Sequence, residues 1–335
     1  MNRSNGYLKL RYLWLLALVM ILACGRTATT QTITTVEVEP TEKPAPAETE
    51  PIAAEPTRPE QDVVGGDQTR TLSSGGIERT YYLHIPPNYD PAQATALVLA
   101  YHGISLNAQE MMRISGFSAQ ADKDNFLVAY PEGYGSRQSW NGGECCGEAM
   151  KREVDDVGFT RAMIEDIARQ VNIDRSRIFA TGFSNGAIMV YRLACELADQ
   201  IAAIGPVAAA PATASCNPSR PVSVIHFHGD ADELNPYEGE KRAGAADFMA
   251  VEDGIALWVG LDGCPTQAQE TQTGNIVQRV YGPCQQNSAV VLYKVLGGEH
   301  AWPGGEAVSE EIGALSDEID ATTLMWAFFQ EHPLP

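Results

Sequence analysis

A serine between two glycines is the first feature of this sequence that could perform chemistry. Ser184 stands in the segment G-F-S-N-G at positions 182–186, after an apolar strand-like run, Arg177 to Thr181, and before a helix-like run, Ala187 to Leu197. Glycines two residues before and after a serine, on a strand-to-helix turn, are typical of a nucleophile elbow. The turn is so tight that larger flanking side chains would collide. It is expected to strain the serine and to lift its hydroxyl toward the positive end of a helix.

A base and an acid follow Ser184 in the order that nucleophilic catalysis needs. The strand-like run Val222 to His228 is followed by Asp230 and Asp232, and the run Val290 to Leu296 is followed by His300. Because the carboxyl ends of parallel strands lie on one rim of a sheet, these side chains are expected to meet the serine there. His300 would take the serine proton and return it to the leaving group, and an aspartate would orient the imidazole. Asp232 is favoured over Asp230 because it lies deeper in its loop, whereas Asp230 is expected to brace the turn.

Attack by Ser184 would create an oxyanion that needs two hydrogen-bond donors. One is expected to be the backbone N–H of Asn185, directly after the serine. The second is expected from the loop after an early buried strand, at Ile104 in His102-Gly103-Ile104. His102 is expected to support this loop rather than to react.

Aromatic residues beside these loops suggest how a substrate could be held. Such rings could stack on a planar or sugar-like group, or they could simply pack the loops against the sheet. The candidates for substrate binding are Trp140, Tyr237 and Trp302.

The elements that must position these residues alternate between strand and helix. Continuous apolar runs indicate strands buried on both faces, and Asp155 or Asp156 could cap a helix that ends near Val171. Thr80 to Ile85 alternates and ends at two prolines, which predicts an early edge strand. We therefore expect residues 67–335 to form one α/β domain, a mostly parallel sheet with helices on both faces. The other predicted strands are Ala96–Tyr101, Phe126–Tyr130, Arg177–Thr181, Ile201–Ala209, Val222–His228 and Val290–Leu296, and Thr322–Gln330 is predicted as a closing helix.

The beginning of the chain is typical of an export signal. Three cations, Arg3, Lys9 and Arg11, precede a short apolar run that ends at Ala23-Cys24. Residues 1–24 are predicted to be a lipoprotein-type signal in which Cys24 is lipidated; a plain secretory signal and an uncleaved anchor are the alternatives. Residues 25–66 are rich in Thr, Pro and Glu and are predicted to form a disordered linker. Each alternative exports the protein, and lipidation would anchor it to a membrane.

Charge argues against two classes of partner, and cysteine content agrees with export. The net charge of −20 excludes nucleic acid and anionic lipid headgroups as favoured partners. Six cysteines remain beyond Cys24, which permits three disulfides in an oxidising compartment. Cys264 and Cys284 flank a strand-like segment in turn-like contexts and are predicted to pair. The adjacent Cys145 and Cys146 are expected to bond to two different distant cysteines, and Cys195 and Cys216 complete the set without assigned partners.

Several motifs together resemble a known family. The sequence is similar to the polyhydroxybutyrate depolymerase and feruloyl esterase family of secreted α/β-hydrolase serine esterases over nearly all of residues 70 to 305. This resemblance implies Ser184 as nucleophile, Asp232 as acid and His300 as base, acting on carboxylic esters without a cofactor. It implies polyhydroxyalkanoate-type oligoesters or feruloyl and acetyl esters of plant polysaccharide as substrates, in a bacterial secreted or cell-surface protein. The sequence departs from the family pattern at Ile104, where a cysteine or small residue is frequent, and at Glu299, where glycine is common. The motifs that carry the resemblance are Y-H-G at 101–103, W-N-G-G-E-C-C-G at 140–147, D-D-V-G-F at 155–159, G-F-S-N-G at 182–186, H-G-D-A-D at 228–232 and G-E-H-A-W-P-G at 298–304.

Two alternatives come from other functional classes. The segment H-F-H-G-D-A-D at 226–232 could project His226 and His228 from one face of a strand toward Asp230 and Asp232, as in a metal-dependent hydrolase. That interpretation would leave the serine elbow unexplained. The other alternative is a non-catalytic surface-binding lipoprotein that uses an esterase-like fold.

Overall fold

The computed structural model describes residues 65–213, 215–240, 248–308, 313 and 316–335. The predicted signal and its Cys24, and the predicted linker up to residue 64, lie outside these residues. No helix in the described part of the chain is both long enough and apolar enough to cross a membrane.

One ten-stranded sheet runs through the domain, in the order β1-β2-β4-β3-β5-β6-β7-β10-β9-β8. Six neighbouring strands, from β4 to β10, are parallel, and the two sheet edges are antiparallel. The strands are β1 Gly66–Ser74, β2 Ile77–Ile85, β3 Thr95–Tyr101, β4 Leu127–Pro131, β5 Ile173–Phe183, β6 Ala203–Val207, β7 Ser223–Gly229, β8 Gln269–Thr273, β9 Ile276–Tyr281 and β10 Val290–Val295.

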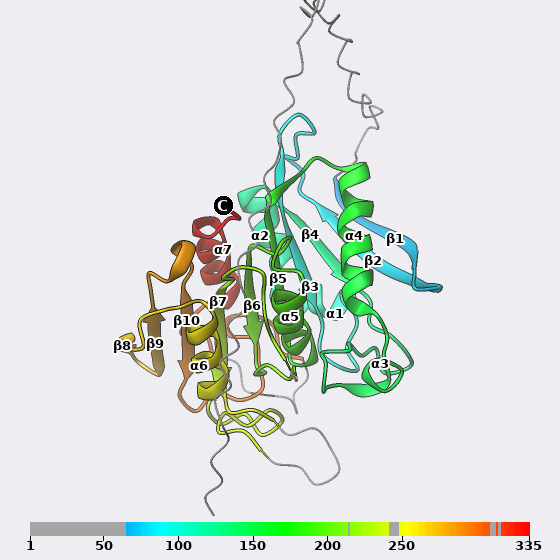
Figure 1. Cartoon of the computed structure of the whole chain (residues 1–335). Helices are drawn as coiled ribbons and strands as arrows, with labels where there is room; N and C mark the ends of the chain where they lie inside the picture. The colour runs from blue at the N-terminus through cyan, green and yellow to red at the C-terminus, as the bar shows by residue number, and fades with distance from the viewer. Residues whose placement is uncertain (1–64, 214, 241–247, 309–312, 314–315) are drawn as a thin grey trace, which may run out of the picture. The chain divides into compact units, whose positions relative to one another are not determined.

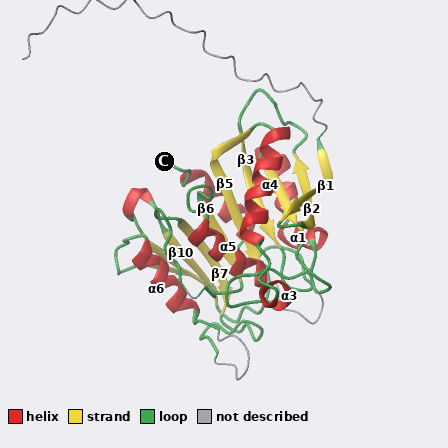
Figure 2. Ribbon diagram, turned by 45° about the vertical axis from the view of Figure 1, so that its right-hand side comes forward, coloured by secondary structure: helices red, strands yellow, loops and turns green. Residues whose placement is uncertain are grey.

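Helices cover both faces of this sheet, as Figures 1 and 2 show. Helices α4, α5 and α6 pack on one face and α1, α2 and α7 on the other. Along β3, Leu97, Leu99 and Tyr101 contact the first layer, whereas Val98 and Ala100 contact the second. This alternation explains why β3 is a continuous apolar run. The helices are α1 Ala108–Ser115, α2 Phe117–Asp124, α3 Gly147–Lys151, α4 Asp156–Gln170, α5 Asn185–Glu196, α6 Val251–Leu261 and α7 Ala321–Glu331, with a short 3-10 turn at Gln285–Asn287.

The predicted α/β architecture is confirmed, and the predicted buried strands correspond to β3, β4, β5, β6, β7 and β10. The predicted cap of α4 is Asp155, whose Oδ1 accepts a hydrogen bond from the Gly158 N–H at 2.7 Å. The predicted edge strand is wrong in one respect. It is β2, which is paired on both sides, and the true edge is the polar strand β1. Sequence inspection missed β1 because its alternate residues are exposed and it contains little apolar surface.

Candidate active site

Ser184 lies at the sharp turn between β5 and α5. Its backbone has φ 55° and ψ −119°, a strained conformation for a residue with a side chain. A methyl group on Gly182 would collide with the Gly186 carbonyl, and one on Gly186 would collide with the Tyr101 carbonyl. Both glycines are therefore required sterically, as the spacing predicts. Ser184 itself is half-buried.

His300 and Asp232 meet at the carboxyl ends of the parallel strands, as predicted. β7 and β10 are neighbouring parallel strands, and the loops after them bring the His300 Nδ1 to 2.7 Å from Asp232 Oδ2. Both side chains are buried. Asp230 points elsewhere: its Oδ1 accepts a hydrogen bond from the Gly297 N–H at 2.6 Å, and its Oδ2 lies 3.5 Å from Lys294 Nζ. The structure thus pairs Asp232 with the histidine and uses Asp230 to join two loops.

The carboxylate of Asp232 is held by several donors. Its Oδ1 accepts the backbone N–H groups of Leu234 at 2.9 Å and Asn235 at 2.8 Å, while its Oδ2 faces His300 and lies 3.4 Å from His228 Nε2. Burial alone would raise the pKa of Asp232, but the hydrogen bonds from His228 and His300 outweigh burial and hold this pKa well below its usual range. Asp232 is therefore ionised at neutral pH, as an acid that orients an imidazole must be.

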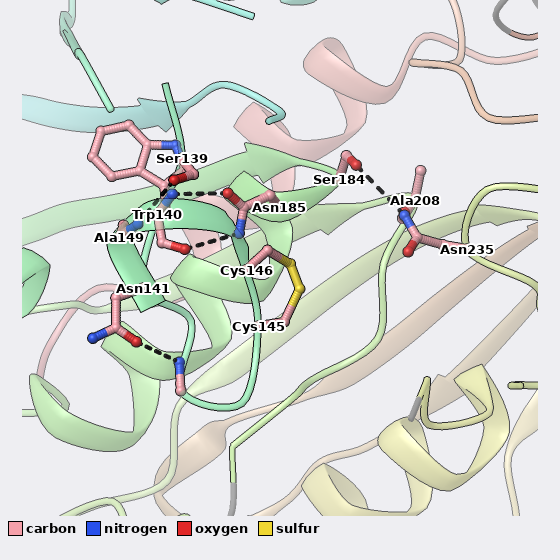
Figure 3. The surroundings of a disulfide bond; sticks show 11 residues. Ser139, Trp140, Asn141, Cys145, Cys146, Ala149, Ser184, Asn185, Ala208 and Asn235 are labelled. Carbon is pink, nitrogen blue, oxygen red and sulfur yellow. Dashed lines mark hydrogen bonds between the residues drawn. A yellow bond between two sulfur atoms is a disulfide. The ribbon is translucent and has the colours of Figure 1, made fainter. Parts of the chain in front are cut away.

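The Ser184 hydroxyl receives a contact that sequence inspection missed. Asn235 Nδ2 lies 3.5 Å from Ser184 Oγ and donates to the Ala208 carbonyl at 2.9 Å (Figure 3). Within the described residues no hydrogen bond joins Ser184 Oγ to His300, whose ring lies against Phe183 with centroids 4.8 Å apart. Such bonds often tighten only when substrate binds. The signal for Asn235 is its position three residues after Asp232, in the same turn.

Asn185 is fixed by a two-point clamp. Its Oδ1 accepts the Trp140 N–H at 2.8 Å and its Nδ2 donates to the Trp140 carbonyl at 3.1 Å (Figure 3). The side chain is thus committed to Trp140, which leaves the backbone N–H as the group that Asn185 could offer to an oxyanion. The loop after β3 also reaches the serine, because a methyl group built on Gly103 would lie 3.3 Å from Ser184 Cβ. Ile104 is the next residue of that loop.

His102 is hydrogen-bonded to this loop and supports it. Its Nε2 accepts the Gly133 N–H at 3.0 Å, so its Nδ1 carries the proton and donates to the Gly103 carbonyl at 2.8 Å. Burial lowers the pKa of His102 to about 4, although the bond to Gly103 opposes that shift. A neutral ring with both nitrogens occupied acts as a support.

The three aromatic candidates are buried: the exposed fractions are 0% for Trp140, 2% for Tyr237 and 1% for Trp302. Their polar atoms are also occupied by partners inside the protein: the indole N–H groups donate to the His102 carbonyl and to Thr322, and the Tyr237 hydroxyl to Glu252. This burial argues against the predicted stacking on a substrate and favours the alternative, in which the rings pack the loops against the sheet.

The disulfides confirm one predicted pair and correct the expectation for Cys145 and Cys146. Cys264 bonds to Cys284, as predicted, and Cys195 bonds to Cys216. The expectation that the adjacent Cys145 and Cys146 bond to distant partners is wrong, because they bond to each other. Cys195 and Cys216 are already close, with their Cα atoms 5.0 Å apart. The adjacent pair lies in the loop below Asn185 (Figure 3).

The alternative metal site is not formed in the described residues. The two rings face each other, with His226 Nε2 3.1 Å from His228 Nδ1. The remaining ring nitrogens are bonded to the Tyr191 hydroxyl and the Asn235 carbonyl, at 2.8 Å in each case. The part of the chain that the structure describes has no group of three or more His, Cys, Asp or Glu side chains arranged to hold a metal ion.

The strand order, the serine elbow and the paired histidine and aspartate define the class: this is an α/β-hydrolase. Sequence comparison adds the family. The chain is 30% identical over 239 residues to feruloyl esterase B of Piromyces equi, covering 68% of this chain and 44% of that protein. It is 30% identical over 289 residues to the putative esterase NocK of Nocardia uniformis subsp. tsuyamanensis, covering 78% of this chain and 83% of that protein. The chain therefore belongs to the α/β-hydrolase esterase family that its motifs resemble.

The same comparisons limit what can be transferred. The chain spans less than half the length of the Piromyces feruloyl esterase. No family model matches the chain. Among solved structures, an acetyl xylan esterase from Aspergillus awamori superposes with a TM-score of 0.54 at 15% identity, covering 70% of this chain and 94% of that one. At that identity the likeness shows the fold alone.

Proposed function

We propose that the protein is a serine esterase that hydrolyses carboxylic esters through an acyl-enzyme on Ser184. The observation that carries this proposal is the 2.7 Å contact between His300 and Asp232 on the rim where the strained Ser184 turn ends. Asp232 is ionised and buried, so it fixes His300 with its Nδ1 protonated and leaves Nε2 free to act as a base.

The chemistry then follows in two balanced halves. Ser184 Oγ bonds to the ester carbonyl carbon while its proton passes to His300 Nε2, and the oxyanion is bound by the N–H groups of Asn185 and Ile104. When the tetrahedral intermediate collapses, the alcohol leaves with the proton from His300. Water next attacks the acyl-enzyme and gives its proton to His300, and the serine oxygen recovers that proton as the acid departs.

We propose feruloyl or acetyl esters of plant polysaccharide as the substrates. The support is that relatives bear the names feruloyl esterase and bifunctional acetylxylan esterase/xylanase. Polyhydroxyalkanoate-type oligoesters would use the same acyl-enzyme chemistry and serve as the competing substrate class in the assay.

We further propose that the protein is exported. The cationic and apolar start of the chain up to Cys24 supports a signal, and the three disulfides in the described residues suit an oxidising compartment. Lipidation of Cys24 would make it a surface lipoprotein. Detergent partition of the protein expressed in a bacterium tests this, with Cys24→Ala as the control. Recovery of both proteins in the aqueous phase would exclude the anchor.

The function is tested with purified protein on a substrate panel. The panel holds aryl esters of increasing acyl length, methyl ferulate, acetylated xylan and amorphous hydroxybutyrate polymer. We expect turnover of methyl ferulate or acetylated xylan, and no turnover by a folded Ser184→Ala variant. Turnover that survives Ser184→Ala would refute the proposed nucleophile. A wild-type protein without activity on any ester would favour a surface-binding role.

A further inference from the structure

A row of buried polar groups leads from the core of the domain to Asp232. The hydroxyl of Tyr191, on α5, lies 2.8 Å from His226 Nδ1. His226 Nε2 lies 3.1 Å from His228 Nδ1, and the two rings are nearly parallel, with an interplanar angle of 13°. His228 Nε2 lies 2.8 Å from the Asn235 carbonyl and 3.4 Å from Asp232 Oδ2. Tyr191 and both histidines are at most 2% exposed.

The acceptors at one end fix every proton in this row. His228 Nε2 faces a carbonyl and a carboxylate, so it must carry a hydrogen. In the neutral ring Nδ1 is then an acceptor, and His226 Nε2 donates to it. His226 Nδ1 is in turn an acceptor, and the Tyr191 hydroxyl donates to it. The donors therefore all point the same way, from Tyr191 toward Asp232.

An added proton on His226 would reverse its hydrogen bond to Tyr191. Protonation of His226 Nδ1 would place an N–H against the Tyr191 hydroxyl, which could then no longer donate to it. Burial, and next the neighbouring His228, hold the pKa of His226 well below its usual range. Every ring nitrogen of the row therefore has a partner within the protein, and none is left for a metal ion or a reactant.

We propose that His226 and His228 are positioning residues of the esterase, which act through Asp232 and the Asn235 turn. This inference rests on the proposed function. His228 holds the Asn235 carbonyl, and the N–H of that same residue holds Asp232 Oδ1 at 2.8 Å. One ring therefore fixes both ends of the turn. The turn aims Asp232 at His300 and the Asn235 amide at Ser184.

Matched substitutions of His228 separate positioning from packing. Glutamine places an amide N–H near the position of Nε2, whereas phenylalanine fills the volume without a donor. We expect His228→Phe to lower kcat on an aryl ester at least tenfold with KM within about twofold, because the ring does not touch substrate. His228→Gln should retain kcat within about threefold. Thermal unfolding shows that the compared variants are folded.

The pH profile gives a readout that packing alone would not move. The titratable groups that face Asp232 are His228, from β7, and His300, from the loop after β10. A carboxylate that loses the His228 donor attracts the His300 imidazolium more strongly. The acid limb of kcat/KM should therefore move to higher pH in His228→Phe. Unchanged kcat and an unchanged acid limb in folded His228→Phe would overturn the proposal.

A second measurement does not depend on activity. Nitrogen-15 chemical shifts of the imidazoles, assigned with His226→Gln and His228→Gln, report the tautomer of each ring in the wild-type protein. We expect both rings as the Nε2–H tautomer at pH 7. A ring with its hydrogen on Nδ1 would overturn the row even if the esterase assay succeeds. If His228→Phe does not fold, His226→Leu and His226→Gln replace the pair, and a kcat equal in both would also overturn it. Failure of Ser184→Ala to abolish turnover would instead refute the proposed function.

Discussion

Substitution of Asp232 by asparagine tests the proposed role of this carboxylate in orienting His300. Asp232 Oδ1 accepts two backbone N–H groups, those of Leu234 and Asn235, at 2.9 and 2.8 Å. In Asp232→Asn the amide oxygen must stay with these two donors, so the amide nitrogen takes the place of Oδ2, opposite His300. A donor would then face the His300 Nδ1–H. The ring can avoid this only by moving its hydrogen to Nε2, which removes the base from the side of the serine.

The size of the loss follows from this forced orientation. The side chain of Asp232 is fully buried, so water cannot replace the missing acceptor. A triad histidine held in the wrong tautomer loses about 10⁴-fold in kcat, which corresponds to about 5 kcal/mol in the activation barrier. We expect a loss of this order in kcat, with little change in KM, in the initial rates of p-nitrophenyl acetate hydrolysis.

Asp230→Asn is the matched control. Asp230 bridges Gly297 and Lys294 and does not contact His300, so its amide should keep kcat within about threefold. The assignment of Asp232 would be refuted if folded Asp232→Asn lost less than tenfold, or if the Asp230 variant showed the larger loss.

Three further predictions concern stability and the elbow. Burial raises the pKa of Asp262 to about 7, so its proton stays on in the folded state while the unfolded chain loses it near pH 4. Stability is therefore lost as pH rises from about 4 to 7, by up to about 4 kcal/mol. In urea unfolding, the free energy of unfolding of Asp262→Asn relative to that of wild type should be higher at pH 8 than at pH 5. An equal difference at the two pH values would contradict this. Joint replacement of Cys264 and Cys284 by serine should lower the free energy of unfolding by about 3 kcal/mol, and an unchanged urea midpoint would speak against a stabilising bridge. Gly186→Ala forces a methyl group against the Tyr101 carbonyl and should lower kcat at least about tenfold. Thermal unfolding of the variant shows whether it is folded. Wild-type turnover in the folded variant would contradict the steric requirement for glycine.

The parts of this protein that could be predicted are those set by local pattern. The turn at Ser184 is predictable because it demands glycine on either side. The meeting of His300 with Asp232 was found because neighbouring parallel strands end on one rim. In each case the chain direction and steric exclusion leave few arrangements, so residue order alone indicates the geometry.

The parts that escaped depend on contacts between distant segments. Asn235 approaches Ser184 only through the path of a turn, and its position three residues after Asp232 does not by itself show where its side chain points. The bond between Cys145 and Cys146 is not predicted, because the cysteines expected as their distant partners, Cys195 and Cys216, are joined to each other by the fold. The sequence leaves open whether Trp140 contacts a substrate or packs in the core, because an aromatic residue in a loop has the same sequence signature in either case.

The clamp between Asn185 and Trp140 has a mechanical consequence. Two hydrogen bonds between the side-chain amide of Asn185 and the backbone N–H and C=O of Trp140 resist both sliding and rotation. The 139–147 loop and the first turn of α5 must therefore move as one body. An ester that displaces this loop would move the Asn185 N–H by a similar distance. The way a substrate fits against the loop would therefore change the position of the hydrogen-bond donor at the carbonyl under attack. Substrate selection and transition-state binding would then be linked through one residue, Asn185.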